Sequence, residues 1–151
     1  EDQINNLFRN SLLLENTLYN FGTTQSKWDR KTNAYCMPVG RYLISNAFPR
    51  GWEILELPKY LGFRFTHNYG TIEYRMFNSV DSSLIEIARA NTLLELVENS
   101  KKIILKKDFS NIKELLPRSW GFLNTYYKSP SKIELEFTSD YLTYLSSIRK
   151  Y

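Results

Sequence analysis

The sequence predicts an α+β fold in which an antiparallel sheet packs against helices. Two arms, residues 59–66 and 71–78, alternate between apolar and polar side chains, which is the period of a half-buried strand. The four residues between them, His-Asn-Tyr-Gly, contain the Asn and Gly that hairpin turns favour. Other segments repeat apolar residues at helical spacing. With 151 residues the chain has the length of one domain, so we expect residues 1–151 to form a single α+β domain or the C-terminal part of a longer protein.

Folding the two arms about that turn predicts their register. The expected cross-strand pairs are Thr66 with Thr71, Phe65 with Ile72, Arg64 with Glu73 and Phe63 with Tyr74. Alternate side chains share a face, so one face is apolar, with Leu61, Phe63, Phe65, Ile72, Tyr74 and Met76. The other face is polar, with Arg64, Thr66, Thr71, Glu73 and Arg75. A face that combines a carboxylate with guanidinium groups either meets solvent or lines a site for a charged ligand.

Before the hairpin, apolar residues at helical spacing predict a helix over residues 3–19 that stops near Gly22. The polar, irregular stretch 22–38 predicts a long loop, and long loops often carry function. Residues 40–48 fit a short helix. Residues 52–57 alternate weakly, and we expect a strand there.

After the hairpin, the capping-box pattern at residues 83–86 opens a helix that is expected to run to about Asn99. Its expected inward stripe is Leu84, Ile87, Ala88, Leu94 and Val97. Ser110 is expected to cap a helix that ends near Pro117, and a loop should cover residues 124–131. The alternating residues 132–137 predict a last strand, followed by a closing helix from Ser139 or Asp140.

Composition limits the classes of protein to consider. No apolar run approaches the roughly 20 residues that a membrane span needs. Cys36 is the only cysteine and cannot form an internal disulfide, so a reducing compartment such as the cytoplasm is expected. One histidine and one cysteine argue against a zinc site. Because no His lies within sequence reach of Cys36, this residue is more typical of a packed apolar side chain than of a nucleophile.

The charge is mildly basic, at +4 from 20 Lys and Arg against 16 Asp and Glu. This value fits an anionic partner such as a nucleotide or a nucleic acid, and it fits solubility equally well. Eleven Tyr and nine Phe are able to stack on bases or to fill a core, and their spacing forms no recognisable nucleic-acid motif. The richness in Asn, Lys, Ile and Tyr is typical of AT-rich genomes, such as those of phages or low-GC bacteria.

Two segments carry a family resemblance. Residues 70–78 read Gly-Thr-Ile-Glu-Tyr-Arg-Met-Phe-Asn, which resembles the Gly-Thr-Ile-Glu-Phe-Arg-x-Phe-Asn signature of the amidoligase family. Upstream, residues 29–38 read Asp-Arg-Lys-Thr-Asn-Ala-Tyr-Cys-Met-Pro, which is similar to the family's Arg-x-Asn-x-Tyr-Cys-x-Pro segment. The two motifs follow the family's order, and the resemblance spans about residues 12–100. Amidoligases are carboxylate–amine ligases of the glutamate–cysteine ligase and glutamine synthetase superfamily.

The resemblance implies an ATP-dependent enzyme with a Mg²⁺ requirement, in which ATP phosphorylates a carboxylate and an amine then attacks the acyl phosphate to form an amide. When the roles of the family's signature residues are carried over to this chain, the resemblance implies that Glu73 and Arg75 are the catalytic residues. Glu73 is expected at the metal and nucleotide, and Arg75 at the phosphate or acyl group. Arg30, Asn33 and Arg64 are expected to bind nucleotide or substrate.

Three features depart from the family pattern. Ser79-Val80 stands where the family has Gly-Thr, and Arg64 lies near the place of a family Asn. The family also has an N-terminal portion with paired acidic residues for the metals, and no counterpart precedes Asn10. Either the chain is the back part of a longer enzyme, or another chain supplies the acidic half, or catalysis has been lost. Two other functions therefore stay open: a non-catalytic protein-binding or structural module, and a basic nucleic-acid-binding domain.

Overall fold

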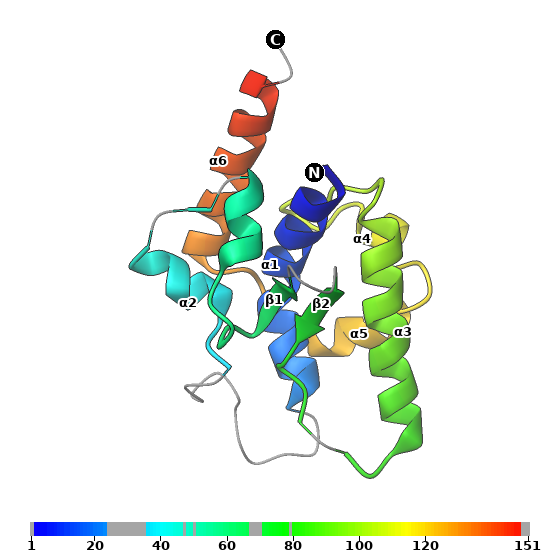
Figure 1. Cartoon of the computed structure of the whole chain (residues 1–151). Helices are drawn as coiled ribbons and strands as arrows, with labels where there is room; N and C mark the ends of the chain where they lie inside the picture. The colour runs from blue at the N-terminus through cyan, green and yellow to red at the C-terminus, as the bar shows by residue number, and fades with distance from the viewer. Residues whose placement is uncertain are drawn as a thin grey trace.

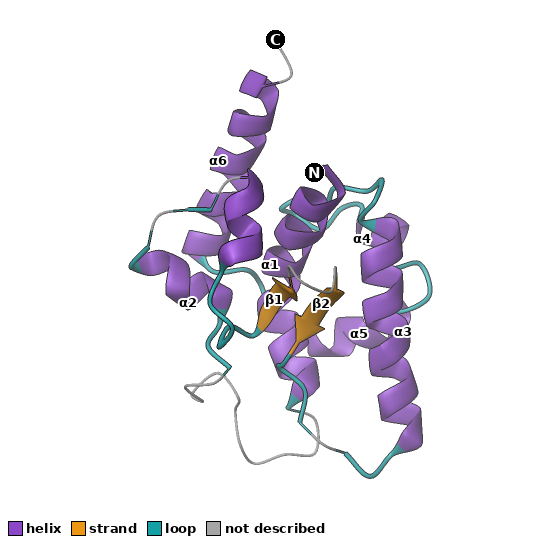
Figure 2. Ribbon diagram, in the orientation of Figure 1, coloured by secondary structure: helices purple, strands orange, loops and turns teal. Residues whose placement is uncertain are grey.

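The computed structural model describes residues 2–23, 36–46, 48–49, 51–66, 71–78 and 80–148. Within these ranges the chain is mostly helical, with one hairpin of two short antiparallel strands, which confirms the α+β class (Figure 2). The elements in chain order are α1 (Asp2–Gly22), α2 (Val39–Ile44), the 3-10 helix η2 (Gly51–Glu56), β1 (Phe63–Thr66), β2 (Thr71–Tyr74), α3 (Ser83–Asn99), α4 (Ile112–Leu115), α5 (Trp120–Leu123), the 3-10 helix η3 (Asn124–Tyr126) and α6 (Lys132–Ile148). No helix in the described ranges is long and apolar enough to cross a membrane.

Helix α1 forms the centre of the core. It contacts α2 and α6 on one side and α3 on another, and the hairpin lies in front of it in Figure 1. Every residue from Asn5 to Glu15 is buried. The sequence accounts for this burial because Leu12, Leu13 and Leu14 are consecutive, so their side chains leave the helix in three directions. The polar residues of the same stretch are buried with hydrogen bonds, as where the Asn10 side-chain amide donates to the Ser100 hydroxyl and to the Ile103 carbonyl, both at 2.9 Å.

The hairpin has the register that its alternation predicts, with Phe63 opposite Tyr74 and Arg64 opposite Glu73. Its apolar face packs on α1, where the Phe63 ring centroid lies 5.6 Å from that of Phe8. The Tyr74 hydroxyl also lies within 2.8 Å of the Ser11 hydroxyl oxygen. These contacts fix which face of the hairpin points away from α1, and that is the polar face.

Several expected helices are confirmed with small shifts in their bounds. The predicted helix 3–19 is α1, which runs on to Gly22, and the predicted helix 40–48 is the shorter α2. The predicted helix 83–99 is α3, whose start is capped by the Ser82 hydroxyl, 3.4 Å from the Ile85 amide nitrogen that donates to it. The helix expected before Pro117 is the single turn α4, but the expected Ser110 cap is wrong, because the residue at the N-cap is Asn111 and it makes no side-chain cap hydrogen bond.

Two predicted strands are wrong. Residues 52–57 lie largely in the 3-10 helix η2, where Ile54 is buried and Trp52 is exposed; six weakly alternating residues are too few to separate the two periods. Residues 132–137 open α6 instead of forming a strand. A reciprocal cap decides this, because the Ser131 amide donates to the Glu134 carboxylate at 3.2 Å and the Glu134 amide donates to the Ser131 hydroxyl at 3.4 Å.

The predicted inward stripe of α3 is also wrong in its main members. Leu84, Ile87 and Leu94 are 77%, 56% and 69% exposed. The residues of α3 that are buried are Arg89, Thr92 and Leu96. Helix α3 therefore packs on the core by a face that contains an arginine.

Candidate functional site

The polar face of the hairpin gathers three charged side chains at its centre. Arg75 donates from Nε and Nη2 to Oε2 of Glu73, at 3.2 and 3.0 Å. The Arg64 Nε lies 3.5 Å from the same oxygen, in an ion-pair contact that makes no hydrogen bond. The cross-strand register brings Arg64 to Glu73, and the two-residue period brings Arg75 to the same face. The grouping predicted for Arg64, Glu73 and Arg75 is thus confirmed.

The backbone around Arg75 is held on two sides. Its amide donates to the Gly62 carbonyl at 2.7 Å, which continues the hairpin pairing beyond the end of β2. Its carbonyl accepts from the Cys36 thiol, with the sulfur 3.1 Å away. A backbone fixed in this way keeps the guanidinium of Arg75 on the face that carries Glu73.

This arrangement leaves bonding capacity for a ligand. The guanidinium groups of Arg64 and Arg75 both contact Oε2 of Glu73. The other carboxylate oxygen, Oε1, has no hydrogen bond or ion pair with any residue in the described ranges. The side chains of Arg64, Glu73 and Arg75 are 23%, 41% and 35% exposed, so solvent and solutes reach them. Two cations against one anion give the cluster a net charge of +1. Planar guanidinium groups beside an accessible surface favour a phosphate or carboxylate ligand.

The same cluster offers little to a metal ion by itself. Among the described residues no group of three Asp, Glu, His or Cys side chains lies close enough to hold one. Oε1 of Glu73 is a hard oxygen of the kind that Mg²⁺ prefers, and Mg²⁺ commonly completes its coordination with nucleotide phosphates and water. The site therefore fits a metal that arrives with a phosphate ligand better than a metal bound by protein alone.

Arg30 and Asn33 lie outside the described residues, but the two ends of their segment are described. The chain leaves the described part at Thr23, next to Gly22, whose carbonyl accepts from the Asn78 amide at 2.8 Å. It re-enters at Cys36, which bonds to the Arg75 carbonyl as described above. Both ends are therefore attached to residues 75–78, directly after β2.

Cys36 is a packed residue that links the chain after the segment 24–35 to Arg75. Its side chain is fully buried, and its carbonyl accepts from the Tyr19 hydroxyl at 2.8 Å. The next residue, Met37, pairs with the chain before β1, since the Met37 amide donates to Tyr60 O at 2.9 Å and the Gly62 amide donates to Met37 O at 2.7 Å. The expectation of a packed cysteine is confirmed by this burial.

No protein-family model, curated protein or solved structure matches the chain in the comparisons. The features that bear on function are accordingly the geometry of the hairpin face and the motifs that it carries.

One buried acidic group escaped the sequence reasoning. Glu15 is fully buried on α1, and its carboxylate accepts from the amides of Val39 and Gly40 at 2.7 and 3.0 Å. A Cβ added to Gly40 would lie 3.1 Å from Oε1 of Glu134 and 3.3 Å from Oε1 of Glu15, so the two carboxylates approach this glycine together. Glu15 holds the start of α2 by satisfying amides that have no partner within that helix. Its signal in the sequence is a single acid directly after three consecutive leucines.

Proposed function

We propose that the chain carries part of the active site of an ATP-dependent carboxylate–amine ligase, which forms an amide through an acyl phosphate. The observation that supports this most is the placing of Glu73 between Arg64 and Arg75 on an accessible sheet face, within the segment that resembles the amidoligase signature. The attachment of both ends of the segment 24–35 beside residues 75–78 adds support, since that segment carries the second motif.

The proposed roles follow from charge. ATP transfers its terminal phosphoryl group to a substrate carboxylate, ADP leaves, and an amine then attacks the acyl carbon and releases phosphate. Arg75 and Arg64 would bind the phosphoryl oxygens and neutralise the negative charge that gathers there during transfer. Oε1 of Glu73 would hold Mg²⁺, which when bound neutralises nucleotide phosphates and orients them. Arg30 and Asn33 would add contacts to nucleotide or substrate from the segment attached beside this face.

Arg64 has a specific part in this proposal. Its Nε is buried and has no hydrogen-bond partner in the described residues, although it lies 3.5 Å from Glu73. The Arg64 side chain as a whole is 23% exposed, so an anionic ligand would meet other atoms of the guanidinium and not the buried Nε. Arg64 is therefore expected to bond more strongly with ligand present than without it.

The first test is the binding of Mg-ATP by the full-length gene product, measured by calorimetric titration. Removing a charge-assisted hydrogen bond costs about 1.5–3 kcal/mol, which corresponds to a roughly ten- to hundredfold higher Kd. Arg75→Ala and Glu73→Gln should show such losses. The matched controls are Lys101→Ala and Glu98→Gln, which break an exposed ion pair of 2.9 Å at the C-terminal end of α3 and should leave the Kd unchanged.

The second test addresses the reaction. Hydroxylamine in place of the amine should trap the acyl phosphate as a hydroxamate when ATP and a mixture of amino acids and other carboxylates are supplied. Wild-type protein that binds no Mg-ATP, or that binds it equally well in the Glu73 and Arg75 variants, would refute the proposal. Nucleotide binding without hydroxamate or phosphate release would keep the site and remove the ligase activity.

A further inference from the structure

Arg9 is a buried cation for which the described part of the chain holds no counter-ion. The residue lies on α1 and is 2% exposed. Its Nη1 donates to the Leu105 carbonyl, but no described Asp or Glu forms an ion pair with it, and its Nε has no hydrogen-bond partner. Burial lowers the pKa of Arg9 to about 10, so the side chain is charged at neutral pH. Arg89, which is also buried, has the Glu86 carboxylate 3.4 Å away. A buried charge without a counter-ion is costly, so Arg9 gains from an anion beside it.

Arg9 lines a hollow of about 410 Å³ between α1 and the loop that joins α3 to α4. This loop passes beside the N-terminal half of α1 (Figure 1). The other lining residues all belong to the loop: Ile104, Leu105, Lys106, Lys107 and Asp108. Nη2 of Arg9 donates to no described residue and is not one of the buried atoms that lack a partner, so solvent reaches it. This nitrogen is therefore the part of the guanidinium that a ligand in the hollow can meet.

Hydrogen bonds within the protein fix the loop wall of this hollow. The Asn10 side chain accepts from the Leu105 amide at 2.9 Å. The Asn111 side chain accepts from the Lys106 amide and donates to the Ile104 carbonyl, each at 2.9 Å. Because these bonds already order the wall, a ligand that binds there has little ordering cost to overcome.

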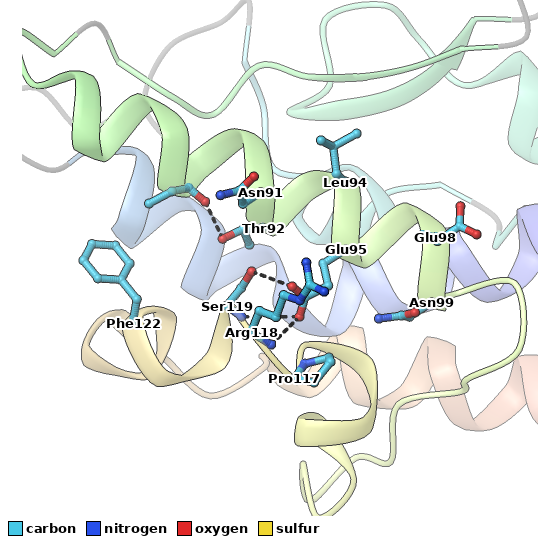
Figure 3. Close-up of a pocket in the computed structure, with 11 residues that line it drawn as sticks. Asn91, Thr92, Leu94, Glu95, Glu98, Asn99, Pro117, Arg118, Ser119 and Phe122 are labelled. Carbon is cyan, nitrogen blue, oxygen red and sulfur yellow. Dashed lines mark hydrogen bonds between the residues drawn. The ribbon is translucent and has the colours of Figure 1, made fainter.

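A larger hollow, of about 640 Å³, lies between α3 and residues 117–122, but its central carboxylate already has partners. Figure 3 shows that Glu95 is bonded across the hollow. Its carboxylate accepts from the amide of Arg118 at 2.8 Å and from the amide and hydroxyl of Ser119 at 3.3 and 3.2 Å. None of the buried polar atoms that lack a partner among the described residues belongs to this lining. The unpaired charge therefore favours the hollow at Arg9 as a binding site.

The charge of the lining indicates which anion fits. Arg9, Lys106 and Lys107 are three cations against the single carboxylate of Asp108, so the lining carries a net charge of +2. The Asp108 carboxylate is engaged elsewhere, since it accepts from the Ser110 amide at 2.9 Å. A phosphomonoester carries a charge of about −1.5 to −2 at pH 7, whereas a carboxylate carries −1. The phosphate group therefore matches the net charge of the hollow better.

We propose that the hollow at Arg9 binds the phosphate group of a small phosphomonoester. Nη2 of Arg9 would donate to one phosphate oxygen, and the exposed ammonium groups of Lys106 and Lys107 would contact the others. The Lys107 ammonium also bonds to the Ser139 hydroxyl, and an ammonium has three N–H donors, so donors remain for the ligand. This site shares no residue with the charged cluster on the hairpin, and it does not depend on the ligase activity proposed there.

Calorimetric titration of the full-length chain with phenyl phosphate, benzoate and inorganic phosphate tests the class of ligand. Phenyl phosphate should bind at least tenfold more tightly than benzoate, which has the same ring and one negative charge. It should also bind more tightly than inorganic phosphate, since Ile104 and Leu105 give the hollow an apolar wall. Absence of phenyl phosphate binding, or equal binding of benzoate, would overturn the proposal. Equal binding of inorganic phosphate would identify free phosphate as the ligand and overturn the phosphomonoester.

Variants of the exposed lysines test the place of binding, because they leave the buried Arg9 and its contact with Leu105 intact. Lys106→Ala and Lys107→Ala should each raise the Kd for phenyl phosphate roughly two- to fivefold. Lys113→Ala is the matched control, since Lys113 is exposed on the neighbouring helix α4 and does not line the hollow. An unchanged Kd in both lining variants, or an equal rise in the control, would overturn the proposal.

Two further variants separate this site from the hairpin. Arg9→Lys keeps the charge and loses the planar fork, so it should raise the Kd for phenyl phosphate roughly tenfold, with circular dichroism as the check on folding. If this variant does not fold, the lysine variants decide. Arg75→Ala should leave the Kd for phenyl phosphate unchanged. Loss of phenyl phosphate binding in Arg75→Ala would assign the ligand to the hairpin cluster and overturn the site at Arg9.

Discussion

Replacing Arg89 by methionine should be among the most destabilising single changes on α3. The Arg89 side chain is only 4% exposed, and its guanidinium donates to the carbonyls of Asn78, of Gly22 at 3.2 Å and of Phe21 at 3.5 Å. The last two are at the C-terminal end of α1, where a cation meets the negative end of the helix dipole. The guanidinium carbon also lies 5.7 Å from the ring centroid of Phe21. Burial lowers the pKa of Arg89, and Glu86 opposes that shift.

The expected loss of stability is about 3 kcal/mol. Hydrogen bonds to a charged group contribute roughly 1.5–3 kcal/mol each, and a cation at a partly buried helix C-terminus adds up to about 2 kcal/mol. Two effects reduce this sum. The Gly22 carbonyl keeps the Asn78 amide as a donor at 2.8 Å, and methionine no longer carries the desolvation cost that lowers the pKa of the arginine. For a chain of 151 residues, 3 kcal/mol corresponds to a fall in Tm of roughly 6–12 °C.

Urea unfolding followed by circular dichroism measures this loss as a change in the free energy of unfolding. Arg89→Lys should lie between wild type and Arg89→Met, since it keeps the charge and loses the planar fork. Glu86→Gln removes only the 3.4 Å contact from a carboxylate that is 56% exposed, so it should cost about 0.5 kcal/mol or less. If the free energy of unfolding of Arg89→Met lies within about 0.5 kcal/mol of the wild-type value, Arg89 does not stabilise the packing of α3 on α1.

Two further predictions use the same unfolding experiment. Gly22→Ala should cost about 3 kcal/mol, because its Cβ would lie 2.0 Å from the Met76 carbonyl oxygen, whereas Gly121→Ala meets nothing within 4 Å and should be neutral or slightly stabilising; equal effects would contradict the packing argument. The Ser110 amide donates to the Asp108 carboxylate and holds the pKa of Asp108 below 3.8 in the folded state. As the pH falls, Asp108 is therefore protonated in the unfolded state before it is protonated in the folded state. The stability gap between wild type and Asp108→Asn should therefore be constant at neutral pH and shrink as the pH falls through 3.8 and below, and a gap that persists in acid would contradict this assignment.

The hairpin and its charged face were predictable because two local signals agree. Strict alternation fixes which side chains share a face, and a four-residue connection fixes the register, so Arg64 had to meet Glu73. The sharing of one carboxylate oxygen by two guanidinium groups was not predictable, since it depends on rotamers. The anchoring of Cys36 to Arg75 was hidden for another reason, because it joins residues that are 39 positions apart.

The wrong predictions relied on the spacing of apolar residues alone, without the helix caps and the tertiary contacts that also decide the structure. Residues 133, 135 and 137 alternate as a strand does, and the Ser131–Glu134 cap that starts α6 outweighs that pattern. Apolar spacing correctly predicted a helix at α3, and it gave no means of telling an inward row of apolar residues from an outward one. Burial of an arginine in place of three large apolar residues contradicts the usual preference, and only the carbonyls at the end of α1 explain it.

The burial of Arg89 and the exposure of Leu84, Ile87 and Leu94 have a common geometric cause. At 100° per residue, Arg89 lies 140° from both Leu84 and Leu94 and 160° from Ile87, so the arginine and these apolar residues occupy opposite sides of α3. Turning the helix by half a turn to bury the apolar residues would pull the guanidinium away from Phe21 and Gly22 and leave the end of α1 without its cation. The contact of Arg89 with α1 therefore holds the apolar residues outward. It follows that Leu94→Glu should leave the free energy of unfolding nearly unchanged, because Leu94 is 69% exposed, whereas Arg89→Met should lower it.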